Sequence, residues 1–258
     1  MLALAAVLAA FALPAPVPCD TCWHPPLNTS WQWELSVVPK PPFLDVDMYD
    51  IDAFDTPAST VAALHQSRPG RRVTCYLSAG SWEDWRPDAG EFPRAILGRP
   101  LSGWPGERYL DIRRYQGRLG KLMDARLDLC AAKGFDAVEL DNVDAYTNRS
   151  GFPLSAEDQL AYNAWLANEA HRRGLSVALK NDNAQIPQLL PYFDWALNEQ
   201  CFQYDECDPY TQFTAAGKAV FGVEYRLPAS EFCPEANALN FNFLKKRLSL
   251  RAWRLACR

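Results

Sequence analysis

Hydrophobic and polar positions along most of the chain alternate in a way that predicts strands and helices following one another. Short runs rich in β-branched and aromatic residues are separated by longer amphipathic segments, and Gly134 and Gly174 stand where helices should end. This order is typical of an α/β protein with a parallel sheet. The eight predicted strands are Trp31–Val37, Leu44–Asp50, Val73–Ser78, Phe135–Asp141, Leu175–Lys180, Phe193–Glu199, Lys218–Glu224 and Ala238–Phe243.

Amphipathic helices are predicted between these strands, at Leu119–Ala132 and at Ser155–Arg173, which begins with a good N-cap sequence, Ser-Ala-Glu-Asp. Eight strands fill the 258 residues and leave no room for a second domain. We therefore predict a single α/β domain, a (β/α)8 TIM barrel, over residues 27–258. A doubly wound open sheet is the alternative, but the sequence has no GxGxxG or GxxxxGK[ST] loop after the first strand.

The N-terminal segment differs in composition from the rest of the chain. Residues 2–13 are all apolar and are followed by small residues and prolines, so residues 1–18 are predicted to be a signal peptide. The usual basic residue before the apolar run is missing, and a buried N-terminal helix is the alternative. A signal peptide implies a secreted, extracellular protein.

Eight cysteines agree with export, because an even number in an exported chain suggests disulfides. Cys201 and Cys207 enclose a short loop and are the best predicted pair, and Cys233 with Cys257 is a weaker one. Cys75 and Cys130 lie in apolar runs and are expected to be free core thiols. Cys19-x-x-Cys22 could be half of a zinc site, but no second CxxC or HxxxH accompanies it.

The net charge of −5 and the absence of a long basic run argue against nucleic acid as a partner. An acidic cleft would favour a cationic or neutral substrate. No stretch of 18 apolar residues follows residue 20, so no membrane-spanning segment is predicted there. We expect a monomer without a metal or other cofactor.

Polar residues gather where the predicted strands end, and the active sites of such barrels lie at the C-terminal ends of the strands. Five polar strand ends around one rim therefore predict a catalytic site. The residues concerned are Asp50 and Asp52, then Glu139, Asp141, Asn142 and Asp144, then Lys180, then Asn198 and Glu199, and finally Glu224 and Tyr225.

A pair of carboxyl groups within this set suits the hydrolysis of a glycosidic bond, which needs an ionised carboxylate and a proton donor on either side of the bond. Asp141 and Glu199 end strands on opposite sides of the strand that carries Lys180, so they can face each other across a sugar. Lys180 could hold one of them ionised. Glu139 shares the parity of Asp141 and should lie one layer deeper, either in the site or simply paired with Lys180.

Aromatic residues are abundant, and those near the predicted rim favour a carbohydrate cleft, since sugar rings stack on aromatic faces. They are Trp33, Tyr49, Tyr76, Trp82, Trp104, Tyr146, Tyr204 and Tyr225. None of the three histidines falls at a predicted strand end and no GxSxG occurs, so a Ser-His-Asp or Cys-His hydrolase is disfavoured.

Several long runs resemble glycoside hydrolase family 114 over about residues 30–255. They are YDIDAFDT, CYLSAGSWEDWRPD, GWPGERYLDIR, GFDAVELDNVDAY, LKNDNAQ and DWALNEQCFQYDEC. The resemblance implies a (β/α)8 barrel with endo-α-1,4-polygalactosaminidase activity on an exopolysaccharide.

The family's catalytic pair falls on Asp141, as nucleophile, and Glu199, as acid/base, while Asp50 and Asp52 would bind the substrate's amine or hydroxyl groups. Leu140 replaces the proline usual in the family, and its side chain should point away from the barrel axis. Two other functions compete with hydrolysis. Carboxylates on adjacent strands also resemble a metal-dependent enolase-type lyase, and the third possibility is a non-catalytic carbohydrate-binding barrel.

Overall fold

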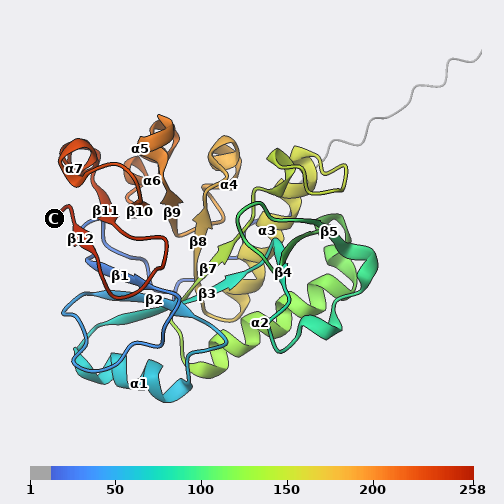
Figure 1. Cartoon of the computed structure of the whole chain (residues 1–258), viewed down its shortest axis with the longest axis horizontal. Helices are drawn as coiled ribbons and strands as arrows, with labels where there is room; N and C mark the ends of the chain where they lie inside the picture. Colours follow the sequence, from blue (N-terminus) through green and yellow to red (C-terminus); the bar gives the residue numbers. More distant parts are fainter. Residues whose placement is uncertain (1–12) are drawn as a thin grey trace, which may run out of the picture.

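The computed structural model describes residues 13–258, so residues 1–12 of the predicted signal peptide lie outside the described part of the chain. Its centre is a curled sheet of eight parallel strands that follow one another in chain order, with a ninth, antiparallel strand at the end (Figure 1). The parallel strands are β1 (Trp31–Glu34), β2 (Met48–Asp52), β3 (Arg72–Ser78), β7 (Ala137–Asp141), β8 (Ser176–Lys180), β9 (Trp195–Glu199), β10 (Val220–Glu224) and β11 (Phe241–Lys245).

The C-terminal segment joins the last parallel strand to the first. Strand β12 (Leu255–Ala256) pairs antiparallel with β11, and the preceding Arg254 donates from Nη1 to the Trp31 carbonyl at 2.8 Å. Leu35 N donates to the Leu250 carbonyl at 3.0 Å. In Figure 1 the red C-terminal segment accordingly lies beside the blue β1. The predicted (β/α)8 barrel is thus confirmed.

Helices cover the outside of the barrel. They are α1 (Ala58–Ser67), α2 (Gly120–Lys133), α3 (Ala156–Arg172), α4 (Ile186–Leu189), α5 (Cys201–Tyr204), α6 (Thr211–Ala215) and α7 (Ala229–Ala238). The two predicted long helices are present. Ser155 caps α3 in a reciprocal box with Asp158, and α2 ends at Gly134, whose φ of 83° favours glycine.

Four details of the sequence prediction need correction. Strand β2 ends at Asp52 rather than Asp50, and β11 begins at Phe241 because Ala238 still belongs to α7. Residues 35–47 form the loop between β1 and β2, so the predicted strand ends at Val37 and Leu44 lie in a loop. Between β3 and α2 the chain forms a second, three-stranded sheet that the periodicity did not indicate, made of β4 (Ser81–Glu83), β5 (Leu97–Pro100) and β6 (Glu107–Leu110) in the order β4-β6-β5.

Alternation along the strands separates two apolar layers. One parity fills the barrel interior, where Trp31, Trp33, Trp195 and Phe221 pack together. The other parity faces the helices and forms the larger core. Leu140 belongs to the outer layer, as expected for a side chain that points away from the axis. Parity on each strand therefore decides which polar residues can reach the barrel mouth.

Four disulfides cross-link the described residues. The predicted pairs Cys201–Cys207 and Cys233–Cys257 are present, and Cys19 is bonded to Cys22 rather than forming part of a zinc site. The expectation that Cys75 and Cys130 are free thiols is wrong, because they form a disulfide. Cys75 lies on the outer face of β3 and Cys130 on the buried face of α2, so the fold brings together two residues 55 positions apart.

Replacing Cys75 and Cys130 together by alanine should lower the free energy of unfolding by about 4 kcal/mol, because the unfolded chain regains the entropy of a long closed loop. Urea unfolding of the wild type and the double variant measures this difference. The matched double variant of Cys201 and Cys207 should lose less, since that loop spans 6 positions. Equal losses from the two pairs would contradict the loop-length argument.

Residues just after the apolar run pack against the barrel. Val17 N donates to Asn168 Oδ1 at 2.7 Å, and the Ala15 carbonyl accepts from Asn168 Nδ2 at 3.1 Å. Cleavage after residue 18, the predicted end of the signal peptide, would remove these contacts. Within residues 13–258 no helix is both long and apolar enough to cross a membrane.

Candidate active site

A cavity of about 580 Å³ opens at the C-terminal ends of the barrel strands, where the sequence predicted the site. Strands β1, β2, β3, β7, β8 and β9 supply its floor, and the small sheet β4-β6-β5 supplies one wall. Eight of the predicted site residues line it, namely Trp33, Asp52, Tyr76, Asp141, Asn142, Asp144, Lys180 and Glu199.

Lys180 is the centre of the charged groups in this cavity. Its Nζ lies 2.7 Å from Glu139 Oε1, 3.0 Å from Asp141 Oδ1 and 3.3 Å from Glu199 Oε2. An ammonium group has three N–H bonds, and each can face one of these carboxylates. Burial alone would lower the pKa of Lys180, but the three carboxylates raise it well above its usual value, so the lysine remains charged.

Asp141 is held ionised by its neighbours. Burial alone would raise its pKa, but the charge of Lys180, the Tyr76 hydroxyl at 2.8 Å from Oδ2 and the Asn142 N–H at 2.9 Å from Oδ1 together lower it. The backbone supports this position closely. Ala79 N and Gly80 N donate to the Asp141 carbonyl, and a Cβ on Gly80 would meet the Asn142 carbonyl at 1.7 Å.

Glu199 lies across Lys180 from Asp141, at the end of β9. The Tyr225 hydroxyl donates to its Oε1, and the side chain of Asn181 accepts a hydrogen bond from the Glu199 backbone N–H at 3.0 Å. Its side chain is 28% exposed, against 18% for Asp141. Both carboxylates therefore reach the cavity, from strands separated by β8.

A deeper layer lies beneath this pair, as the shared parity of Glu139 and Asp141 predicted. Glu139 is fully buried and accepts from Trp33 Nε1 at 2.9 Å as well as from Lys180. Asp50 is also fully buried, and burial together with repulsion from Glu139 raises its pKa well above the usual value. Asp50 therefore lies below the cavity, where burial favours the neutral form of its carboxyl group, and not at the cavity surface.

Three predicted binding residues point away from the barrel interior. Tyr49 packs in the outer core and its hydroxyl accepts from Leu44 N. Asn198 contacts Tyr210 and the Cys201 N–H, and Glu224 accepts from Phe202 N and Gln203 N at the start of α5. On its strand, each of the three alternates with the residues that face inward. This alternation could have identified them in the sequence as outward-facing residues.

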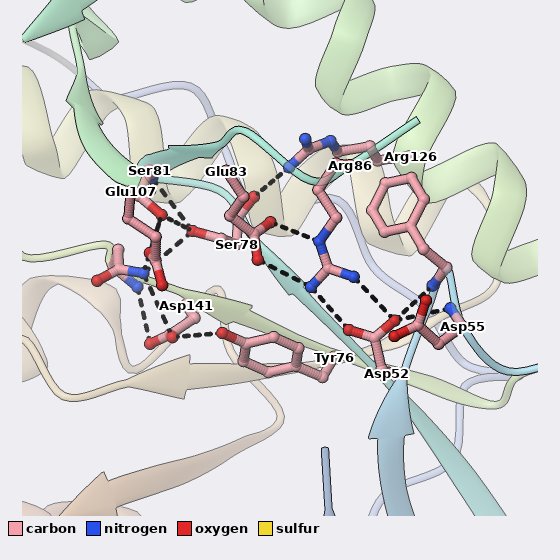
Figure 2. Close-up of polar contacts among 12 residues, drawn as sticks. Asp52, Asp55, Tyr76, Ser78, Ser81, Glu83, Arg86, Glu107, Arg126 and Asp141 are labelled. Carbon is pink, nitrogen blue, oxygen red and sulfur yellow. Dashed lines mark hydrogen bonds and ion pairs between the residues drawn. The ribbon is translucent and has the colours of Figure 1, made fainter. Parts of the chain in front are cut away.

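Asp52 lines the cavity, but it is already paired with Arg86. Arg86 Nη2 lies 2.7 Å from Asp52 and 2.8 Å from Glu83, and the three side chains form a buried cluster (Figure 2). Neither Glu83 nor Arg86 was predicted. Asp144, a carboxyl at the mouth, has no basic partner among residues 13–258, and burial followed by repulsion from Asp141 raises its pKa to about 6.

The wall formed by the small sheet supplies seven cavity residues that the sequence did not indicate. They are Glu83, Trp85, Arg86, Leu101, Ser102, Glu107 and Tyr109, with Trp104 among the aromatics noted from the sequence. Their signal was hidden because they lie in an insertion with short, irregular strands. Within residues 13–258 no group of three or more His, Cys, Asp or Glu side chains has an arrangement suited to a metal ion.

A family model described as glycoside-hydrolase family GH114 matches residues 14–258. The crystal structure of Aspergillus fumigatus Ega3 in complex with galactosamine is 38% identical, with a TM-score of 0.87, and the match covers 94% of this chain and 99% of that one.

Two further matches are more distant. The glycoside hydrolase domain of PelA from Pseudomonas aeruginosa shares the fold, with a TM-score of 0.69 at 14% identity, covering 88% of this chain and 98% of the other. An uncharacterized protein from Deinococcus radiodurans is 28% identical over 225 residues, which are 79% of this chain and 71% of that protein.

Proposed function

Because this chain belongs to glycoside-hydrolase family GH114 and is a glycoside hydrolase, we propose that it cleaves α-1,4-linked galactosamine polymer within the chain, with Asp141 and Glu199 as its catalytic pair. The convergence of both carboxylates on Lys180 is the observation that carries this proposal. The 38% identity to Ega3, crystallised with galactosamine, supports the choice of sugar.

The roles of the two carboxylates follow from their surroundings. Asp141, kept ionised by Lys180 and Tyr76, attacks the anomeric carbon as the nucleophile. Glu199, the more exposed of the two, donates its proton to the leaving glycosidic oxygen. It then takes a proton from the water that releases the sugar from Asp141. The bond from the anomeric carbon to the glycosidic oxygen is replaced by a bond to Asp141, which is then replaced by a bond to the oxygen of water. Each replacement inverts the anomeric carbon, so the two steps together retain its configuration.

The separation of the pair supports retention. Asp141 Oδ1 and Glu199 Oε2 lie 3.0 and 3.3 Å from Lys180 Nζ. The distance between the two oxygens therefore cannot exceed the sum of these two distances. Retaining enzymes hold their carboxyl groups about 5–5.5 Å apart, whereas inverting enzymes need about 6.5–9.5 Å to admit a water.

Retention predicts that the first product released from the polymer carries the α configuration at its new reducing end. Proton NMR of the anomeric signals during the first minutes of digestion, before mutarotation, measures it. Initial release of the β-anomer would contradict the assignment of Asp141 as nucleophile.

An open cavity at the barrel mouth supports cleavage within the polymer rather than at its ends. Early in the digestion the products should be a broad range of oligosaccharides, which mass spectrometry of deacetylated polymer digests resolves. Monosaccharide as the main early product would contradict endo-action, and no product from this polymer would contradict the proposed substrate.

We also propose that the protein is secreted. Four disulfides in the described residues favour an oxidising compartment, and a polymeric substrate cannot enter a cell intact. Exopolysaccharide outside the cell is the substrate that satisfies both observations.

The two competing functions are weakened by separate observations. The enolase-type lyase conflicts with the family assignment, and the ammonium of Lys180 occupies the space between the carboxylates that a divalent ion would need. A purely carbohydrate-binding barrel is disfavoured because both carboxyl groups of a glycosidase pair are present in the cavity.

A further inference from the structure

The wall formed by the small sheet presents two tryptophans to the cavity. Trp85 and Trp104 both line it and are 52% and 50% exposed. Indole rings bury a large apolar area when they can, so two half-exposed rings beside one cavity indicate a surface that a ligand covers. Apolar faces of sugar rings fit such a surface.

A single turn carries both the aromatic surface and a carboxyl group. Trp104 and Glu107 are joined by a hydrogen bond from Glu107 N to the Trp104 carbonyl at 3.1 Å. Gly106 in the same turn has a φ of 93°, and a Cβ there would lie 2.8 Å from the Trp85 ring. Trp85 therefore rests against the backbone of the turn that orients Glu107.

Glu107 differs from the other carboxyls of this wall in its partner. Asp52 and Glu83 are both paired with Arg86 (Figure 2). Glu107 accepts from Ser81 Oγ, a neutral donor, at 2.7 Å, and is 8% exposed at the cavity surface. Burial, followed by repulsion from Glu83 and Asp141, raises its pKa to about 7. A cation that enters beside it would therefore favour the ionised form.

The position of Glu107 is linked to the catalytic pair. Ser81 Oγ lies 2.7 Å from Ser78 Oγ, which accepts from Asn142 Nδ2 at 3.0 Å, and Asn142 Nδ2 lies 3.3 Å from Asp141 Oδ2. Figure 2 shows this chain of contacts from Glu107 to Asp141. Because Glu107 and Asp141 also line the same cavity, a group bound at Glu107 shares that cavity with the sugar at Asp141 and does not lie in a separate site.

We propose that this wall is a second sugar subsite, in which Trp85 and Trp104 stack on a galactosamine ring and the Glu107 carboxylate binds its 2-ammonium group. This rests on the proposed function and deepens it. The two carboxyls that the sequence offered for the amine are engaged elsewhere, since Asp52 pairs with Arg86 and Asp50 lies below the cavity. Glu107 thus makes the wall selective for deacetylated residues.

The test compares kcat and KM on deacetylated polymer and on the N-acetylated polymer of the same linkage. Glu107→Gln should raise KM at least about tenfold on the deacetylated polymer, because a hydrogen bond to a charged group is worth about 1.5–3 kcal/mol, and should change KM little on the acetylated one. Trp85→Ala and Trp104→Ala should raise KM about threefold or more on both polymers, because each removes apolar area that a sugar ring covers. Glu91→Gln and Trp253→Ala, outside the cavity lining, are matched controls.

Calorimetric titration with a galactosamine oligomer, using Asp141→Asn with and without Glu107→Gln, gives a readout free of turnover. Weaker binding in the double variant is expected. Unchanged selectivity and unchanged binding, in a wild type that cleaves deacetylated polymer, would overturn the subsite while leaving the proposed function standing. A wild type that cleaves neither polymer would overturn both.

Discussion

Asp141→Asn and Glu199→Gln should each reduce kcat on deacetylated galactosamine polymer by about 10³-fold or more. General acid–base catalysis by a positioned carboxyl contributes about 10²–10⁴-fold, and an amide can neither attack the anomeric carbon nor donate a carboxyl proton. Both side chains reach the cavity and remain part of its polar lining when the oxygen is replaced by nitrogen. Reducing-end release measures the loss.

The controls are variants of the same type on the surface. Asp45→Asn and Glu91→Gln alter side chains that are 88% and 57% exposed and should keep wild-type turnover. Circular dichroism and the thermal midpoint should confirm that all four variants are folded. Substantial turnover in folded Asp141→Asn or Glu199→Gln would remove that residue from the pair.

Azide separates the two roles. In Asp141→Ala the anion can occupy the space of the missing nucleophile and should give a β-glycosyl azide. In Glu199→Ala it can attack the sugar held on Asp141 and should give an α-glycosyl azide. NMR of the two products reads the configuration directly. Exchanged configurations would reverse the assignment of nucleophile and acid/base.

Lys180→Met should cost about 3–5 kcal/mol of stability, because it leaves Glu139, Asp141 and Glu199 without their shared counter-charge. The pKa of Lys180 is raised in the folded protein, so its contribution is fully present below the pKa of an unfolded lysine and is lost as pH rises through the folded value. At neutral pH, urea unfolding of the wild type and of Lys180→Met should therefore show the full difference in the free energy of unfolding.

The same substitution should lower kcat by about 10²-fold or more, since removing one preorganised charge at a reacting group costs that much. It should also move the acid limb of the pH–activity profile upward, because the charge that lowers the pKa of Asp141 is gone. Lys121→Met, at an exposed position on α2, is the matched control. An unshifted acid limb in a folded Lys180→Met protein would contradict the role given to Lys180.

The barrel and the position of three charged residues at its mouth could be predicted because both depend on strong local signals. Apolar strand runs, glycine helix ends and the parity of Glu139 and Asp141 sufficed to place Asp141, Lys180 and Glu199 around one rim, and the structure brings them together. Tyr49, Asn198 and Glu224 failed as cavity residues because lying near a strand end does not decide which face of the strand a residue occupies.

The wall and the Cys75–Cys130 disulfide could not be predicted because they depend on contacts between distant segments. Glu107 and Trp85 lie in an insertion whose strands of three or four residues carry no clear periodicity. Cys75 and Cys130 meet because α2 packs across β3, and no spacing along the chain encodes that contact. Arg86 likewise finds Asp52 across 34 positions.

Initial rates of reducing-end release by the wild type, on deacetylated α-1,4-galactosamine polymer and on its N-acetylated form, test the central claim most directly. The claim predicts rapid release from the deacetylated polymer and much slower release from the acetylated one, abolished in both cases by Asp141→Asn. No release from the deacetylated polymer by folded wild type, or release that survives Asp141→Asn, would contradict it.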